Sequence, residues 1–224
     1  MPVRLRPTAP IASDAVLVGD PGRALLLAQE LLEEPKMSNH ARGLWGYSGQ
    51  TPQGDTLTIQ ATGIGGPSGS LVLGDLAELG VRRVVRVGTC VGLGEVCGLG
   101  DLLVVTEAVA EGGSAAALGV SAGEPVSPDA KLTARLREGL GQGATAAAIA
   151  SYDAHPSEQA PRAGLAAADM QTAPLLARAR LLGIGAAAVL IVAEMTGGRL
   201  ALEKGALEAA EARAGRAAST TLSA

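Results

Sequence analysis

The stretch AVLVGDPGRALLLAQELLEE, residues 15–34, contains a complete strand–turn–helix unit. Its first four residues are apolar, which is typical of a buried strand. Two glycines and a proline follow, and they predict a tight turn after Val18. From Arg23 to Glu34 the apolar residues recur at helical spacing, so we expect this segment to form a helix.

The same succession of strand and helix is expected along the rest of the chain. Strands are predicted at 55–62, 84–87, 102–108, 144–150 and 186–193, and helices at 68–79, 128–140, 170–182 and 200–218. Loops are expected at 112–125 and 151–168, and a frayed end at 219–224. This alternation predicts an α/β fold: residues 1–224 form a single domain with a central mixed, twisted sheet flanked by helices on both faces.

Composition narrows the class of protein. The chain has 224 residues, of which 47% are hydrophobic, and its mean hydropathy is +0.28, which predicts one globular domain with a large core. The net charge of −4 argues against a nucleic acid or membrane partner. The longest apolar run, 186–193, is far below the ~20 residues of a membrane span. No signal-peptide core is recognisable, so we expect a cytoplasmic protein.

Cysteine and histidine are scarce. Cys90 and Cys97 are the only cysteines; their spacing fits no zinc pattern, and we expect two reduced thiols. His40 and His155 are the only histidines, so a multi-histidine metal centre is not possible and no metal is predicted. The chain lacks phenylalanine, which leaves little aromatic stacking for a ligand.

Three predicted strands end in a glycine-rich corner, at 19–23, 62–68 and 86–89. In α/β sheets, ligands bind outside the carboxyl ends of strands. Glycines let the backbone approach an anion closely, and helix N-termini present free N–H groups to it. These corners also supply two arginines and hydroxyl groups, so together they predict an oxyanion site. A single corner of this kind is only a turn in most proteins, and none of the three is a P-loop or a dinucleotide fingerprint.

Four segments carry a recognisable family pattern: VLVGDPGRA, ATGIGGPSGS, ELGVRRVVRVGTCVGL and GDLLVVTEAV. In this order and spacing they resemble the nucleoside phosphorylase-I family, which includes the uridine phosphorylases and the bacterial hexameric purine nucleoside phosphorylases. The similarity resumes at ADMQTAPLLARARLLGI and AAAVLIVAE. The resemblance implies reversible phosphorolysis of a nucleoside to free base and (deoxy)ribose 1-phosphate. Phosphate is then a co-substrate, and no metal or organic cofactor is required.

The resemblance also assigns the phosphate site. It implies that phosphate is held by Gly19, Arg23, Arg86 and Thr89. A further arginine enters from a neighbouring subunit, and Arg42 stands at that position in SNHARGLWGYSG. The implied assembly is a homodimer or homohexamer with the site completed across the interface. Arginine suits this role because its planar fork binds phosphate oxygens and stays charged, and Arg86 is also expected to take part in catalysis.

The ribose motif departs from the family pattern. The family's Glu-Met-Glu segment is Asp169-Met170-Gln171 here, and these three residues are assigned to the ribose. An amide offers one acceptor oxygen and two donors where a carboxylate only accepts, so sugar binding is expected to be weakened or altered. After the last strand, purine phosphorylases carry an acid and uridine phosphorylases an arginine. Glu194 stands there, as candidate general acid for the leaving base.

The base site is the least defined. Gly92 and Tyr152 are assigned to it, Tyr152 as the stand-in for the missing stacking phenylalanine. Gln159 and Arg162 lie where uridine phosphorylases read the pyrimidine, but three positions apart instead of two. Uracil and purine therefore both remain open as the base.

Two other functions are compatible with the same residues. One is a nucleosidase, which uses water in place of phosphate on the same fold. The other is a non-catalytic binder of nucleoside or phosphate, which the changes at Gln171 and Glu194 would fit. The retained cationic corner favours the phosphorylase, because water needs no cationic cage.

Overall fold

A computed structural model describes residues 2–94, 96–158, 164–197 and 201–223. Within these ranges the strands are β1 (Asp14–Val18), β2 (Glu33–Asn39), β3 (Gly46–Gln50), β4 (Thr56–Ala61), β5 (Arg83–Gly92), β6 (Leu102–Ala110), β7 (Pro125–Val126), β8 (Thr145–Ser151), β9 (Ala167–Asp169) and β10 (Gly185–Met195). The α-helices are α1 (Pro21–Leu31), α2 (Gly65–Glu78), α3 (Gly113–Ala116), α4 (Ala130–Leu140), α5 (Thr172–Leu182) and α6 (Lys204–Leu222). Short 3₁₀ turns are η1 (Ala41–Gly43), η2 (Gly141–Gly143) and η3 (Pro156–Glu158).

All ten strands join one mixed sheet. The order is β10-β6-β8-β9-β5-β1-β4-β3-β2, with β7 paired to β6. β10 also pairs with β5, so β5, β9, β8, β6 and β10 curl into a closed ring. The pairs β1–β4, β1–β5 and β5–β10 are parallel. Their carboxyl ends therefore meet at one edge of the sheet, where α/β proteins bind ligands.

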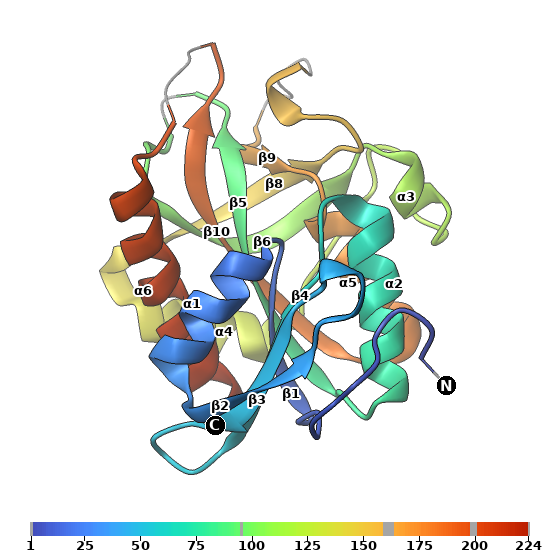
Figure 1. Cartoon of the computed structure of the whole chain (residues 1–224). Coiled ribbons are helices and arrows are strands. Elements are labelled where there is room, and N and C mark those ends of the chain that lie inside the picture. Colours follow the sequence, from blue (N-terminus) through green and yellow to red (C-terminus); the bar gives the residue numbers. More distant parts are fainter. Residues whose placement is uncertain (1, 95, 159–163, 198–200, 224) are drawn as a thin grey trace.

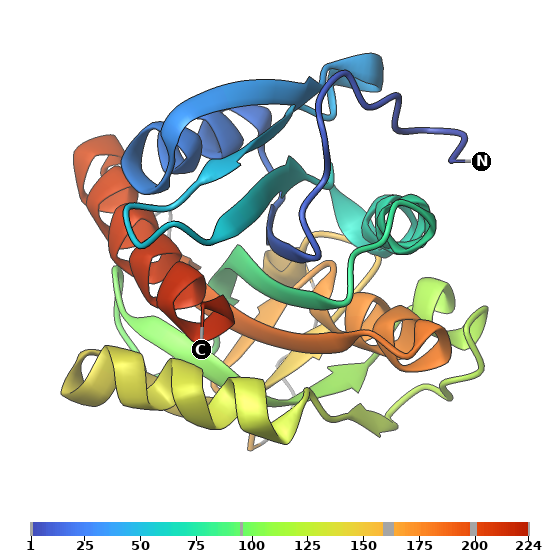
Figure 2. The same ribbon diagram turned by 90° about the horizontal axis from the view of Figure 1, so that it is seen from below.

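Helices cover both faces of the sheet, as the sequence predicted. In Figures 1 and 2, α1, α4 and α6 lie on one side and α2, α3 and α5 on the other. One core, which includes Leu27 and Leu136, packs under the first group, and a second core, which includes Leu73 and Leu175, packs under the other. Burying each such side chain contributes about 1.5–3 kcal/mol, and these two layers fix the helices on the sheet.

The corners that precede α1 and α2 have clear local causes. The Asp20 side chain accepts the Arg23 backbone N–H at 2.9 Å, and Pro21 opens the helix, a favourable start for α1. Gly63 and Gly65 have φ values of 74° and 80°, in the left-handed region that side chains disfavour. These glycines let α2 begin three residues earlier than predicted.

The hairpin of β2 and β3 was not predicted from the sequence. Helix α1 ends at Leu31 and not at Glu34, and the chain turns directly into β2. The β2 sequence, EEPKMSN, is polar and lacks strand alternation. Its backbone pairs with β3, which in turn pairs with β4, so tertiary pairing sets the structure of this edge.

The C-terminal end was also predicted wrongly. Residues 219–222 continue α6, and the Leu222 side chain is buried. The Leu222 carbonyl accepts a hydrogen bond from Arg83 Nη2 at 2.6 Å, which holds the last turn against β5. Likewise α3 lies within a segment that was expected to be a loop, and β7 and β9 begin in such segments.

Cys90 and Cys97 are both free and buried, in agreement with the prediction of reduced thiols. Among the described residues, no helix combines the length and the apolar character that crossing a membrane requires.

Asp75 on α2 fastens the N-terminal segment to the domain. Its buried carboxylate accepts the backbone N–H groups of Arg4 and Leu5 at 2.5 and 2.9 Å, and Arg4 Nη1 at 3.0 Å. Burial raises the pKa of Asp75, but the hydrogen bonds from Leu5 and Arg4 and the charge of Arg4 outweigh it, so the pKa is lowered. The ionised carboxylate therefore stabilises the folded state.

We expect Asp75→Asn to lower the free energy of unfolding by about 1–3 kcal/mol near neutral pH. Because the folded-state pKa is depressed, this stabilisation is present above the unfolded-state pKa. It is lost as the pH falls through the folded-state pKa. Urea unfolding near pH 7 and below about pH 3 measures the difference, with Glu138→Gln on the exposed side of α4 as control. A loss that is the same at both pH values would contradict the assignment.

Candidate active site

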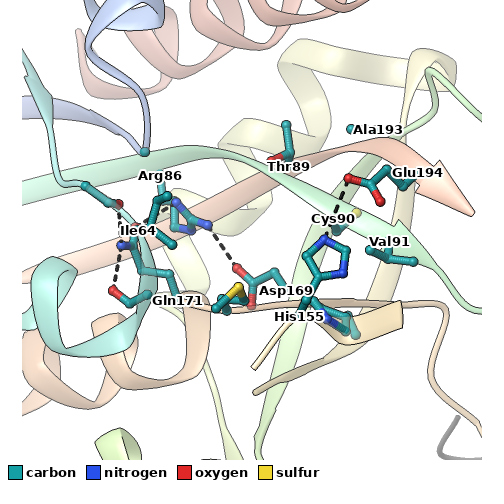
Figure 3. A pocket seen from close by; sticks show the side chains of 16 residues that line it. Ile64, Arg86, Thr89, Cys90, Val91, His155, Asp169, Gln171, Ala193 and Glu194 are labelled. Atoms are coloured by element: carbon teal, nitrogen blue, oxygen red, sulfur yellow. Dashed lines mark hydrogen bonds and ion pairs between the residues drawn. The ribbon is translucent and has the colours of Figure 1, made fainter. Parts of the chain in front are cut away.

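One cavity opens at the carboxyl ends of β1, β5 and β10 (Figure 3). Its empty volume is about 590 Å³, part of it open to solvent. It is lined by Gly19, Gly63, Ile64, Gly65, Arg86, Thr89, Cys90, Val91, His155, Pro156, Ala168, Asp169, Met170, Gln171, Ala193 and Glu194. All three glycine-rich corners contribute to it, so the predicted meeting of the corners occurs.

Arg86 is held rigidly at one side of this cavity. Its Nε donates to Thr172 Oγ1 at 3.1 Å, Nη1 to Gln171 Oε1 at 2.9 Å, and Nη2 to Asp169 Oδ2 at 2.9 Å. The Arg86 residue is only 5% exposed. A guanidinium has five N–H groups, so each terminal nitrogen keeps one that these bonds do not use.

The Asp169 carboxylate is fully occupied by the protein. Besides Arg86, it accepts Ser151 Oγ at 2.5 Å, Thr172 Oγ1 at 2.6 Å and the Thr172 backbone N–H at 3.1 Å. It is buried, and it caps the start of α5 while it orients Arg86. The structure therefore gives Asp169 the role of a support, and not the direct ribose contact that the family resemblance suggested.

Gln171 is equally occupied. Its Oε1 accepts from Arg86 and from Thr62 Oγ1 at 2.9 Å, and its Nε2 donates to the carbonyl oxygens of Gly63 and Gly65 at 3.0 and 2.9 Å. Both lone pairs and both donors of the amide are used. Gln171 thus ties the corner before α2 to Arg86, and its amide is not free to bind a sugar hydroxyl.

Glu194 and His155 meet at the other side of the cavity (Figure 3). The register of β10 against β5 shifts between Val192 and Glu194, and such a bulge re-aims the side chain that follows. His155 Nε2 lies 3.7 Å from Glu194 Oε1, and both side chains are nearly half exposed. His155 Nδ1 lies 2.7 Å from Ser157 Oγ.

Comparison with known proteins identifies the family to which the chain belongs. The chain matches the phosphorylase superfamily over residues 13–223. It belongs to that superfamily.

Curated relatives named purine nucleoside phosphorylase DeoD-type match part of the chain. One from Oceanobacillus iheyensis is 44% identical over 81 residues, which cover 36% of this chain and 34% of the relative. Others, from Clostridium beijerinckii and Clostridium novyi, are 38% and 37% identical over 103 and 105 residues; each match covers 46% of this chain, and 43% and 45% of the relatives. In each case the chain spans less than half the length of the relative that it matches.

Three of the five phosphate residues assigned to this superfamily member line the cavity: Gly19, Arg86 and Thr89. Arg23 does not line it. Its Nε donates to the buried carboxylate of Glu211 on α6. Burial raises the pKa of Glu211, and the charge of Arg23 opposes this only in part. The prediction that the guanidinium groups of Arg23 and Arg86 meet in one cavity is therefore wrong. Glu211 on α6 binds Arg23, and only Arg86 lines the cavity.

Arg42 lines a different hollow, together with Arg4, Arg6 and His40. It lies in η1 with φ of 61°, a conformation that costs a non-glycine residue free energy and that is frequent at functional sites. Arg42 does not line the cavity formed by its own chain. That Arg42 binds phosphate in the cavity of a neighbouring subunit stays a prediction.

Two of the four assigned base residues do not line the cavity. Met170 of the ribose trio lines the cavity, but Gly92 and Tyr152 are not among its lining residues. A Cβ on Gly92 would lie 2.7 Å from Met195 Sδ, so this glycine makes room for core packing. Gln159 and Arg162 lie outside the described residues.

Sequence reasoning assigned no role to His155, which is the one histidine in this cavity. The only available signal was its position in the loop after the strand predicted at 144–150.

Cys90 also lines the cavity, but burial, and secondarily the charge of Asp169, raises the pKa of its thiol well above the usual value. This thiol is therefore neutral and a poor nucleophile. Within the described ranges, no group of three or more His, Cys, Asp or Glu residues is placed to hold a metal ion.

We expect Gln171→Glu to lower the free energy of unfolding by about 1–3 kcal/mol. The carboxylate would place an oxygen against the carbonyls of Gly63 and Gly65, which now receive N–H groups. The added attraction to Arg86 is offset by the cost of burying a second carboxylate. Thermal or urea unfolding measures the change, and Gln142→Glu in the exposed turn η2 is the matched control. Equal or higher stability of the Gln171 variant would show that the corner accepts a carboxylate.

Proposed function

We propose that the protein is a nucleoside phosphorylase that transfers the pentosyl group of a purine nucleoside to phosphate. The observation that carries this proposal is the fixed Arg86 in a cavity whose other side holds Glu194 (Figure 3). One side is suited to an anion and the other to proton transfer. The names of the relatives and the carboxylate at position 194 favour purine over uracil. The buried free thiols fit a reducing compartment such as the cytoplasm.

The phosphate subsite is built from backbone and side chain. Arg86 offers its two remaining N–H groups, Thr89 its hydroxyl, and the corner at Gly19 its backbone. The first turn of α2 adds the free N–H groups of a helix N-terminus. This arrangement holds the nucleophile by hydrogen bonds to a charged group, which are among the stronger ones in proteins.

The charges of the described lining residues indicate that a further cation is needed. Arg86 is balanced by Asp169, and Glu194 adds a negative charge. A phosphate dianion would therefore meet a cavity without excess positive charge. We propose that the protein forms a homodimer or homohexamer and that Arg42 of the partner subunit supplies the further positive charge. Arg23 joins the site only when it breaks its ion pair with Glu211 and binds phosphate instead.

The reaction follows from this division. As the C1′–N bond breaks, its electron pair moves to the base and positive charge builds on the sugar. A phosphate oxygen held beneath C1′ stabilises this charge and then forms the new C1′–O bond. Positioning and electrostatics supply most of the rate enhancement. Met170 is the member of the predicted ribose trio that remains free to contact the sugar, while an acid at the Glu194 side neutralises the departing base.

We expect the protein to release hypoxanthine from inosine only when phosphate is present, as measured by chromatography of the free base. Thr89→Val should raise the KM for phosphate about 10- to 100-fold, since one hydrogen bond to a charged group is lost. Thr220→Val, at an exposed site on α6, is the matched control. Equal rates with and without phosphate would identify a nucleosidase and remove the phosphorylase assignment.

We also expect complementation between two weakened variants, assayed at a phosphate concentration below the KM of either. Arg42→Ala and Thr89→Val subunits should each show weak activity alone, because every site lacks one phosphate ligand. In mixed oligomers formed by co-expression, some sites combine a wild-type Thr89 with a wild-type Arg42 from the neighbour. One of the two sites in each mixed dimer is then intact, so with random assembly phosphorolysis should recover to about a quarter of the wild-type rate. If the mixture is no more active than the sum of its parts, Arg42 does not act across an interface.

A further inference from the structure

A histidine and a carboxylate from distant parts of the chain share the side of the cavity away from Arg86. His155 follows β8 and Glu194 ends β10, and Figure 3 shows both side chains directed toward one another. Within the described residues, this is the only close pair of a basic and an acidic side chain whose two members both line the cavity without a buried hydrogen-bond network around them. It is therefore free to act on a ligand.

We infer that His155 is a catalytic residue that donates the proton to the leaving purine, with Glu194 as the carboxylate that stabilises its charged form. This rests on the proposed function and deepens it, because it assigns the acid and favours a purine base. Neither the sequence motifs nor the relatives' names point to this histidine.

The ring of His155 is oriented from one side. Nδ1 lies 2.7 Å from Ser157 Oγ, a hydrogen bond that leaves Nε2 facing Glu194. Histidine is the most frequent general acid in enzymes, because its ring nitrogen can hold and release a proton within hydrogen-bond reach of a substrate. The separation of 3.7 Å between Nε2 and Oε1 is longer than a hydrogen bond, so the Nε2–H group remains available to a base that enters between or beside the two side chains.

The C1′–N9 bond breaks and its electron pair enters the purine ring, while Nε2 of His155 transfers its proton to N7. The base leaves neutral, and a phosphate oxygen bonds to C1′. The imidazole, nearly half exposed, takes a proton back from solvent. Hydrogen phosphate releases one proton on becoming the sugar ester, so no proton is gained or lost over the cycle.

A comparison of inosine with 7-methylinosine tests the proton transfer separately from the other steps of the reaction. Inosine needs a proton at N7 to leave as a neutral base. The purine of 7-methylinosine already carries a positive charge, so it leaves without a proton. A variant that lacks only the proton donor should lose activity on inosine alone.

We expect His155→Gln and Glu194→Gln to lower kcat on inosine about 100-fold or more, the scale of general acid catalysis, and to change kcat on 7-methylinosine less than about 3-fold. Ser157→Ala should give a smaller loss with the same substrate pattern. The double variant His155→Gln/Glu194→Gln should be no slower than the slower single variant, because residues that act as a unit are not additive. Glu30→Gln, which breaks the surface ion pair with Arg216, is the control for loss of a carboxylate.

Equal losses on both nucleosides, or no loss on inosine, would overturn the role of His155 and leave the phosphorylase assignment standing. Multiplicative losses in the double variant would show that the two residues do not share one proton. If the wild-type protein releases no base from either nucleoside in a phosphate-dependent way, the proposed function itself fails. Unfolding temperatures of all variants distinguish lost chemistry from lost structure.

Discussion

The buried ion pair of Arg86 and Asp169 is the contact on which the site depends. Through Asp169, Gln171 and Thr172, one guanidinium joins β5, the start of α5 and the corner before α2. Removing either partner of a buried ion pair leaves an uncompensated charge, which is strongly destabilising. The geometry of the anion side therefore cannot be separated from the stability of this part of the fold.

The amide at position 171 has a consequence for charge as well as for hydrogen bonding. A carboxylate there would give Arg86 a second negative neighbour beside Asp169, and the cavity floor would become anionic. The neutral amide avoids this and satisfies two backbone carbonyls. Arg86 therefore has one carboxylate neighbour, Asp169, and one neutral amide neighbour, Gln171.

Sequence patterns identified those parts of the protein that are determined locally. Apolar runs and glycine corners predicted the α/β fold, most of its elements, and the meeting of Gly19, Arg86 and Thr89. What they missed depends on contacts between distant segments. The polar segment β2 is a strand because it pairs with β3. Arg23 binds Glu211, a residue 188 positions away, and so does not line the cavity. Neither the sequence around β2 nor the sequence around Arg23 indicates these pairings.

The parallel pairing of β5 with β10 explains why the cavity has two chemically different sides. Arg86 pairs with Ala188, whereas Glu194 pairs with Val91, five residues farther along β5. At about 3.3 Å per residue, this register separates their backbone positions by about 16 Å along the strands. A guanidinium and a carboxylate on adjacent strands would otherwise neutralise each other. Strand register keeps Arg86 and the Glu194–His155 pair on opposite sides of the cavity.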